Sequence, residues 1–202
     1  MTKINLFKFW SLAFLALLLV GATSFAQETE TEQQTEEVDA RKMMNDAFSD
    51  LQMGEFEEAT KTLEKVIEAD KTNYQAMLLA SQAYMQWGVE MAGDDRKAAN
   101  KPLRRGAELM RMVQKGKERL NDNEKRILAT AVYNEACCAA VDGDTDKALK
   151  FLEESIQLGF GELDTLKHDT DFDSIKNDDR FKAIVEKMEQ SENGADESDE
   201  DV

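Results

Sequence analysis

Apolar residues recur every three or four positions along most of the chain, and this spacing is the feature that most restricts the fold. Two stripes flank Gly54, with the members Met43, Met44, Ala47, Phe48 and Leu51, and then Phe56, Ala59, Leu63, Val66 and Ile67. Residues at this spacing share one face of an α-helix, and two helices joined by a short glycine turn pack antiparallel. Because the chain has one proline and no alternating run of β-branched residues, we predict an all-α fold.

The same helical pair is expected twice more. Residues 73–88 form the next first helix, and residues 96–120 form its partner, in which Pro102 either kinks the helix or marks its true start, with Asn100 as a candidate cap. Asn121 and Glu124 predict a capping box that starts the third pair. Gly143 then turns the chain into a return helix that Gly159 ends. The inward stripe of this return helix is Ala148, Leu152 and Ile156.

These units resemble the tetratricopeptide repeat, a family of 34-residue helix-turn-helix units. The matching small, turn and bulky positions are Ala47, Gly54, Ala59 and Leu63 in the first unit, and Ala136, Gly143, Ala148 and Leu152 in the third. The second unit matches in its first helix, at Ser81, Tyr84 and Gly88, and its return helix is stretched. The resemblance implies a short α-solenoid of about three antiparallel helix-turn-helix pairs over residues 40–189.

The last part of this region resembles the closing segment of many bacterial proteins of this kind. Its matching residues are Asp169, Asp171 and Phe172, followed by Asp179, Arg180 and Phe181. The resemblance implies short capped helices and a terminal capping helix.

In the family, the first helices of the pairs line a curved groove that binds a peptide. The corresponding residues here are Met44, Phe48, Gln52, Leu78, Gln82, Met85, Tyr133 and Asn134. This lining is apolar and rich in amides, and Arg41 is the only base at the matched places, so a clamp for a peptide carboxylate is not expected. Tyr133 has a second interpretation, in which it covers the neighbouring helix pair.

Both ends of the chain differ in composition from the helical region. Lys3 and Lys8, an apolar run over residues 9–22, and small residues at Ser24 and Ala26 predict a secretory signal peptide over residues 1–26, with cleavage at about Ala26/Gln27. The alternative is an uncleaved anchor, for which the run is short. Residues 27–39 predict a disordered acidic linker, and residues 190–202 a disordered acidic tail. We therefore expect an exported protein, in the periplasm or outside the cell, without stable membrane insertion.

The chain is strongly acidic, with a formal net charge of −17, and removal of Lys3 and Lys8 with the leader makes it more negative. Such a surface repels nucleic acid and anionic lipid, so a nucleic-acid partner is not expected.

Residues 141–154 have two interpretations. Asp142, Asp144 and Asp146 alternate as in a helix-loop-helix calcium loop, with Glu153 at the twelfth place. Such a loop needs glycine at the sixth place, which is Lys147 here. A turn between two helices instead explains Gly143, and it makes Asp144 a helix N-cap. We expect the turn, and no metal site.

No catalytic or cofactor-binding pattern stands out. The single histidine, His168, lies among polar residues, and the sequence has neither a nucleophile elbow nor a phosphate-binding glycine loop. Cys137 and Cys138 are adjacent and point about 100° apart on a helix, so we expect packing residues, with an intermolecular disulfide as the alternative. Most of the many methionines are expected in the core, with an adaptable binding surface as the alternative.

The prediction is a noncatalytic, exported adaptor or scaffold without a cofactor, which binds a protein or peptide through the groove. A holdase-like or assembly factor for exported proteins is the second hypothesis. An ion-binding protein or an enzyme of unrecognised type is the third.

Overall fold

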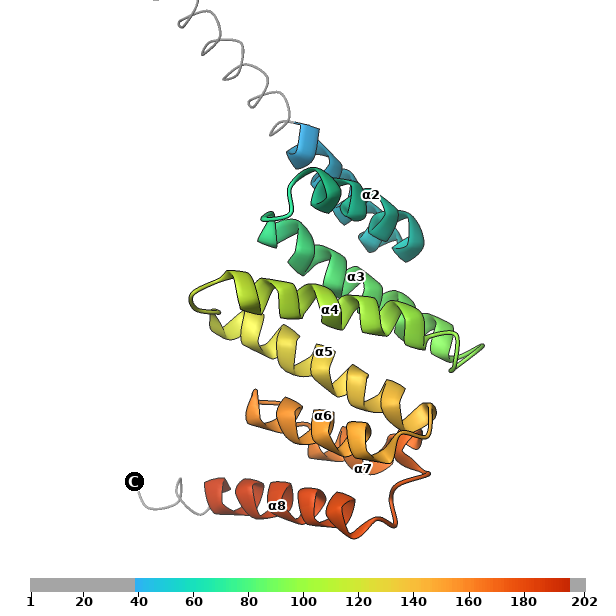
Figure 1. Cartoon of the computed structure of the whole chain (residues 1–202), viewed down its shortest axis with the longest axis vertical. Coiled ribbons are helices and arrows are strands. Elements are labelled where there is room, and N and C mark those ends of the chain that lie inside the picture. Colours follow the sequence, from blue (N-terminus) through green and yellow to red (C-terminus); the bar gives the residue numbers. More distant parts are fainter. Residues whose placement is uncertain (1–38, 197–202) are drawn as a thin grey trace, which may run out of the picture. The chain divides into compact units, whose positions relative to one another are not determined.

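The computed structural model describes residues 39–196 (Figure 1), so the predicted signal peptide and residues 27–38 of the predicted linker lie outside the described residues. The described residues belong to two units. Residues 39–45 are helical and belong to the first unit, and residues 46–196 form the second. Everything that follows concerns the second unit, unless the first is named.

The second unit is built from helices. Residues 46–53 are helical, and the elements after them are α2 (Phe56–Ala69), α3 (Tyr74–Ala92), α4 (Asn100–Gly116), α5 (Asp122–Val141), α6 (Thr145–Gln157), α7 (Leu163–His168), the short 3₁₀ helix η1 (Thr170–Phe172) and α8 (Asp179–Asp196). No strand occurs in residues 39–196, which confirms the predicted all-α class.

Helices that follow one another along the chain also pack against one another (Figure 1). α2 contacts α3, α3 contacts α4, α4 contacts α5, and α5 contacts α6. α3 additionally contacts α5, η1 packs on α5, and α8 contacts both α6 and α7. Local contacts of this kind let each helix bury one face against its immediate neighbours.

Three turns between helices have the same backbone geometry. Gly54, Gly143 and Gly159 have φ angles of 80°, 80° and 104°, in the left-handed region that favours glycine. After each glycine, the next amide donates to a carbonyl five residues earlier: Glu55 to Asp50, Asp144 to Ala139, and Phe160 to Ser155. This arrangement satisfies carbonyl groups at the end of the preceding helix and reverses the chain.

The predicted helix starts are confirmed at two positions and corrected at a third. Asn121 and Glu124 form a reciprocal capping box at the start of α5, and the Asp144 carboxylate caps α6 by accepting from the Lys147 amide. Asn100, expected as a possible cap, is instead the first residue of α4, and its buried side chain donates to the Cys138 carbonyl and to Asp142 of the next helix pair. Pro102 lies in the first turn of α4, where a missing amide hydrogen is tolerated.

The contact between α3 and α4 is unusually close. A Cβ added at Gly106 would lie 3.0 Å from the Ser81 carbonyl oxygen, while the Ser81 hydroxyl donates to the Gly106 carbonyl over 2.8 Å. A side chain at this position would press against that oxygen and push the two backbones apart by a few tenths of an ångström, so glycine favours the close approach. The contact holds one face of α3 against α4.

The C-terminal half has a continuous apolar core. The inward positions predicted for α6 lie in it: Ala148 and Leu152 are fully buried, and Ile156 packs against them from a half-buried position. Phe172 and Phe181, at the predicted closing segment, are buried in the same core. α8 continues to Asp196, so the predicted boundary between domain and tail at residue 189 falls inside this helix. Among the described residues, no helix is both long and apolar enough to cross a bilayer.

Candidate functional site

A cavity of about 850 Å³ opens along α3 and α5, and we call it the α3–α5 cavity. Gln82, Met85 and Asn134, three of the predicted groove residues, line it. Its other lining residues are Phe56, Gln86, Val89, Glu90, Asn123, Arg126, Ile127, Thr130 and Glu162. Side-chain amides, apolar groups and the charged residues Glu90, Arg126 and Glu162 therefore line the cavity together.

The cavity exists because α3 presents two different faces. Gln82, Met85, Gln86 and Val89 are three or four residues apart and share one face of the helix. Ser81 and Gly88, which belong to a neighbouring face, are fully or almost fully buried, with Ser81 bonded to α4. Val89 is 66% exposed, which is unusual for a large apolar side chain in the second unit. The α4 contact thus leaves the Val89 side of α3 open.

The other predicted groove residues lie elsewhere. Leu78 is half-buried and Gln52 is exposed, and neither lines the α3–α5 cavity. Phe48 is 52% exposed and is likewise absent from the cavity lining. Met44 belongs to the first unit. The structure thus brings together three of the eight predicted groove residues in one cavity.

Tyr133 is placed in the core. Its ring stacks on Phe160 with 4.1 Å between the ring centroids, meets Phe172 edge-on, and is 5% exposed. Its hydroxyl donates to Asp169 over 2.7 Å. This environment supports the packing interpretation of Tyr133, because its ring is covered and its polar tip already has a partner. Sequence reasoning missed Val89, Arg126 and Ile127, although their spacing on helical faces carries the same signal.

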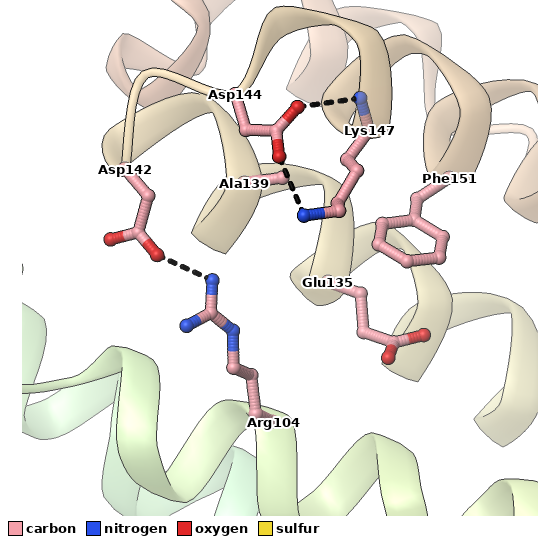
Figure 2. Close-up of a pocket in the computed structure, with 7 residues that line it drawn as sticks. All are labelled: Arg104, Glu135, Ala139, Asp142, Asp144, Lys147 and Phe151. Atoms are coloured by element: carbon pink, nitrogen blue, oxygen red, sulfur yellow. Dashed lines mark hydrogen bonds and ion pairs between the residues drawn. The ribbon is translucent and has the colours of Figure 1, made fainter.

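The aspartates of the residue 141–154 stretch each face a different cation, and two of them line a small cavity (Figure 2). Asp142 binds Arg104 over 2.6 Å, and Asp144 binds Lys147 over 2.7 Å. Asp146 pairs with Arg180 over 2.8 Å. The Arg104 guanidinium lowers the pKa of the Asp142 carboxyl. The arrangement supports the helix-turn interpretation, because the carboxylates diverge toward three cations on separate elements.

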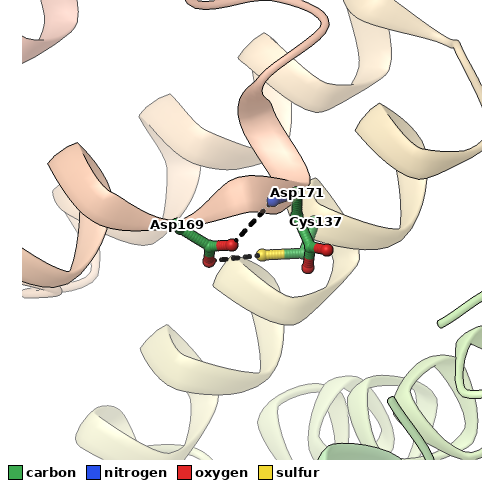
Figure 3. Close-up of side chains that lie close together, drawn as sticks. All are labelled: Cys137, Asp169 and Asp171. Atoms are coloured by element: carbon green, nitrogen blue, oxygen red, sulfur yellow. Dashed lines mark hydrogen bonds between the residues drawn. The ribbon is translucent and has the colours of Figure 1, made fainter. Parts of the chain in front are cut away.

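One group of side chains in the described residues has the spacing of a metal site. The ligand atoms of Cys137, Asp169 and Asp171 lie within 4.8 Å of one another (Figure 3). The Asp169 carboxylate accepts hydrogen bonds from the Asp171 amide, the Cys137 thiol and the Tyr133 hydroxyl. Asp171 receives two hydrogen bonds of 2.6 Å from the Arg96 guanidinium. Asp169 thereby holds the start of η1 against α5, and Asp171 holds η1 to the turn before α4.

The thiols are poorly suited to nucleophilic chemistry. Burial raises the pKa of the Cys137 thiol well above its usual range, and Asp169 and Asp171 raise it further. Burial also raises the pKa of Cys138 to about 11. Both cysteines are free and buried in α5, which confirms their predicted packing role and leaves neither thiol accessible for an intermolecular disulfide. His168 is exposed, as predicted, and its Nδ1 lies 2.8 Å from the Asp164 carbonyl oxygen.

The methionines are divided between the core and partly exposed positions. Met77 and Met110 are fully buried, and Met188 is nearly so. Met85 and Met91 are half-buried and line cavities, whereas Met53 is 66% exposed. The expectation that most methionines lie in the core is therefore confirmed at Met77, Met110 and Met188 and is wrong for most of the others, and the adaptable binding surface stays a prediction.

Comparison of this chain with protein-family models, with curated proteins and with solved structures found no match.

Proposed function

We propose that this protein is a noncatalytic, exported helical-repeat adaptor of the tetratricopeptide type that binds a segment of a protein partner in the α3–α5 cavity. The observation that carries the proposal is the lining of that cavity. Met85, Val89 and Ile127 offer apolar contact, and Gln82, Gln86 and Asn134 offer donors and acceptors toward a peptide backbone.

The repeat assignment rests on the recurrence of one turn. Gly54 and Gly143, which occupy the same place in the first and third units of the resemblance, share a φ of 80° and the same pair of backbone hydrogen bonds. Packing of neighbouring helices in chain order is also typical of repeat proteins. Export rests on the sequence of residues 1–26, and the net charge of −17 disfavours nucleic acid as the partner.

The test is photocrosslinking in the native envelope fraction. A benzophenone amino acid replaces Val89 in one variant and the exposed Glu118, which lies between α4 and α5, in a control. A discrete crosslinked product at position 89 that position 118 does not give supports the proposal. The partner identified in this way should bind Asn134→Ala more weakly. Equal crosslinking at both positions would argue against the α3–α5 cavity as the binding site.

A holdase for exported proteins is the second candidate. It is favoured by three large apolar side chains that are more than half exposed, Phe48, Met53 and Val89. Suppression of the aggregation of several unrelated unfolded proteins, lost on replacing these three residues with serine, would favour the holdase over an adaptor with one partner.

A further inference from the structure

A second large cavity, of about 950 Å³, lies beside α2, α3 and the start of α4, and we call it the α4 cavity. The residues of α3 that line it are Tyr84, Trp87 and Met91. Successive residues of a helix are rotated by about 100°, so these positions lie on the side of α3 opposite to Gln82, Met85 and Val89. The α4 cavity is therefore separate from the α3–α5 cavity.

The charge of the α4 cavity is opposite to that of the chain. Five basic and three acidic residues line it, in a protein with a net charge of −17. Three of the five cations bind acids of this chain: Lys61 binds Glu57 and Glu58, Arg104 binds Asp142, and Arg105 binds Glu64 and Glu108.

The other two cations are Lys97 and Lys101. Both are exposed, and the ammonium group of neither forms an ion pair or hydrogen bond with another described residue. Lys97 lies in the turn before α4 and Lys101 in its first turn, so two like charges that repel one another line the same cavity. An anion bound between them would relieve this repulsion.

An apolar wall faces the same cavity. Trp87 and Met91 are half-buried there, and Pro102 adds a third apolar surface. The Trp87 ring stacks against Tyr84, with 6.2 Å between centroids, which fixes one side of the ring. A simple inorganic anion would leave this wall uncovered, whereas a ligand with both carboxylates and apolar groups would use both parts of the cavity.

The two lysines are placed to contact alternate residues of an extended peptide. Lys97 lies in the turn before α4 and Lys101 in the first turn of α4, and two residues along an extended chain span about 6.8 Å, a distance that two flexible lysine side chains can bridge. Alternate residues of an extended peptide point to opposite sides. We propose that the α4 cavity binds an extended acidic peptide of a protein partner, with alternate carboxylates on Lys97 and Lys101 and the intervening apolar side chains on Trp87 and Met91.

The test uses Trp87 as a reporter. In the full chain with Trp10→Phe, Trp87 is the single tryptophan, since the sequence has two. The probes are the acetylated amide peptide Glu-Leu-Glu-Leu-Glu, its lysine counterpart Lys-Leu-Lys-Leu-Lys, and sodium acetate. The glutamate peptide should change Trp87 emission saturably, and its affinity should fall as salt is added. The lysine peptide, and acetate at the same carboxylate concentration, should have no effect.

Charge-matched variants locate the site. Lys97→Glu with Lys101→Glu should weaken binding of the glutamate peptide about tenfold or more. Lys115→Glu with Lys150→Glu changes the charge equally at exposed positions outside the cavity and should leave binding within about twofold. Val89→Glu, in the α3–α5 cavity, should also leave it unchanged. Equal weakening by the two double variants, equal binding of both peptides, or acetate reproducing the emission change would overturn the proposal.

Discussion

Arg96 and Asp171 are 75 residues apart in the sequence and form a two-point ion pair, with Nε to Oδ1 and Nη2 to Oδ2 distances both of 2.6 Å. The guanidinium also donates to Asn100 at the start of α4. The pair therefore ties the turn before α4 to η1, and it joins the second helical pair to the closing segment. Both side chains are largely buried, with 24% and 15% exposed.

Removal of Arg96 should destabilise the protein strongly. Arg96→Ala leaves the Asp171 carboxylate without its main partner, close to Asp169, and should lower the free energy of unfolding by about 2–4 kcal/mol. Urea unfolding measures the change. The control is Arg180→Ala, which breaks the exposed pairs with Asp146 and Asp178 and should cost much less than Arg96→Ala. Similar losses in the two variants would show that the Arg96–Asp171 pair does not hold the closing segment.

Tyr133 should behave as a packing residue. Tyr133→Ala removes the ring that stacks on Phe160 and should cost about 3–5 kcal/mol of stability. Tyr133→Phe keeps the ring, deprives Asp169 of a donor, and should cost about 1–2 kcal/mol. Thermal unfolding compares the three proteins. A Tyr133→Ala variant that unfolds at the parent temperature but no longer binds its partner would show that Tyr133 belongs to the binding surface.

Ala148 tests the contact between α5 and α6. Its side chain is fully buried in the C-terminal core, so Ala148→Glu places a carboxylate among apolar groups and should cost about 3 kcal/mol or more. Lys150→Glu, at an exposed position of the same helix, is the control and should change stability by ~0.5 kcal/mol or less. Melting temperatures of both variants decide whether this face of α6 is buried.

Calcium should leave stability unchanged, because Asp142, Asp144 and Asp146 already bind Arg104, Lys147 and Arg180. Asp144→Ala removes the cap of α6 and should lower stability equally with and without calcium. Urea unfolding in millimolar calcium and in chelator provides the comparison. A calcium-dependent gain in stability that Asp144→Ala abolishes would indicate an ion site.

Glu154 should contribute to the pH dependence of stability. Hydrogen bonds from Arg111 lower the pKa of Glu154 below 4.5, against the opposing effect of burial. The unfolded chain therefore takes up the proton first as pH falls. The contribution, about 0.5–1 kcal/mol for this partly exposed pair, is present above pH 4.5 and is lost as pH falls through the folded-state pKa.

The comparison is with Glu154→Gln. This variant should be less stable than the parent near neutral pH, and the difference should shrink as pH falls below 4.5. Glu153→Gln, the exposed neighbour, should follow the parent at every pH. Urea midpoints over this range measure the difference, and a gap that stays constant would exclude a role for the titration of Glu154.

Features that depend on neighbouring residues could be predicted from the sequence. The spacing of apolar residues predicts the all-α class, and glycine at 54 and 143 predicts turns that need a positive φ. The caps at Asn121 and Asp144 follow in the same way, because each side chain bonds to an amide three residues ahead. These signals are local, so they can be recognised in the sequence without knowledge of the tertiary structure.

Features that depend on which helical faces meet were decided only by the tertiary structure. Tyr133 lies in the core because the closing segment brings Phe160, Phe172 and Asp169 against it, across 27 to 39 residues of chain. Asn100 bonds to α5 instead of capping α4 for the same reason. A helical period gives the relative directions of side chains on one helix, and the identity of the covering helix depends on long-range packing. The spacing of residues places the linings of the two cavities on opposite sides of α3, but the close contact of α3 with α4 at Gly106, which decides which face of α3 is covered, is a long-range feature that this spacing does not contain.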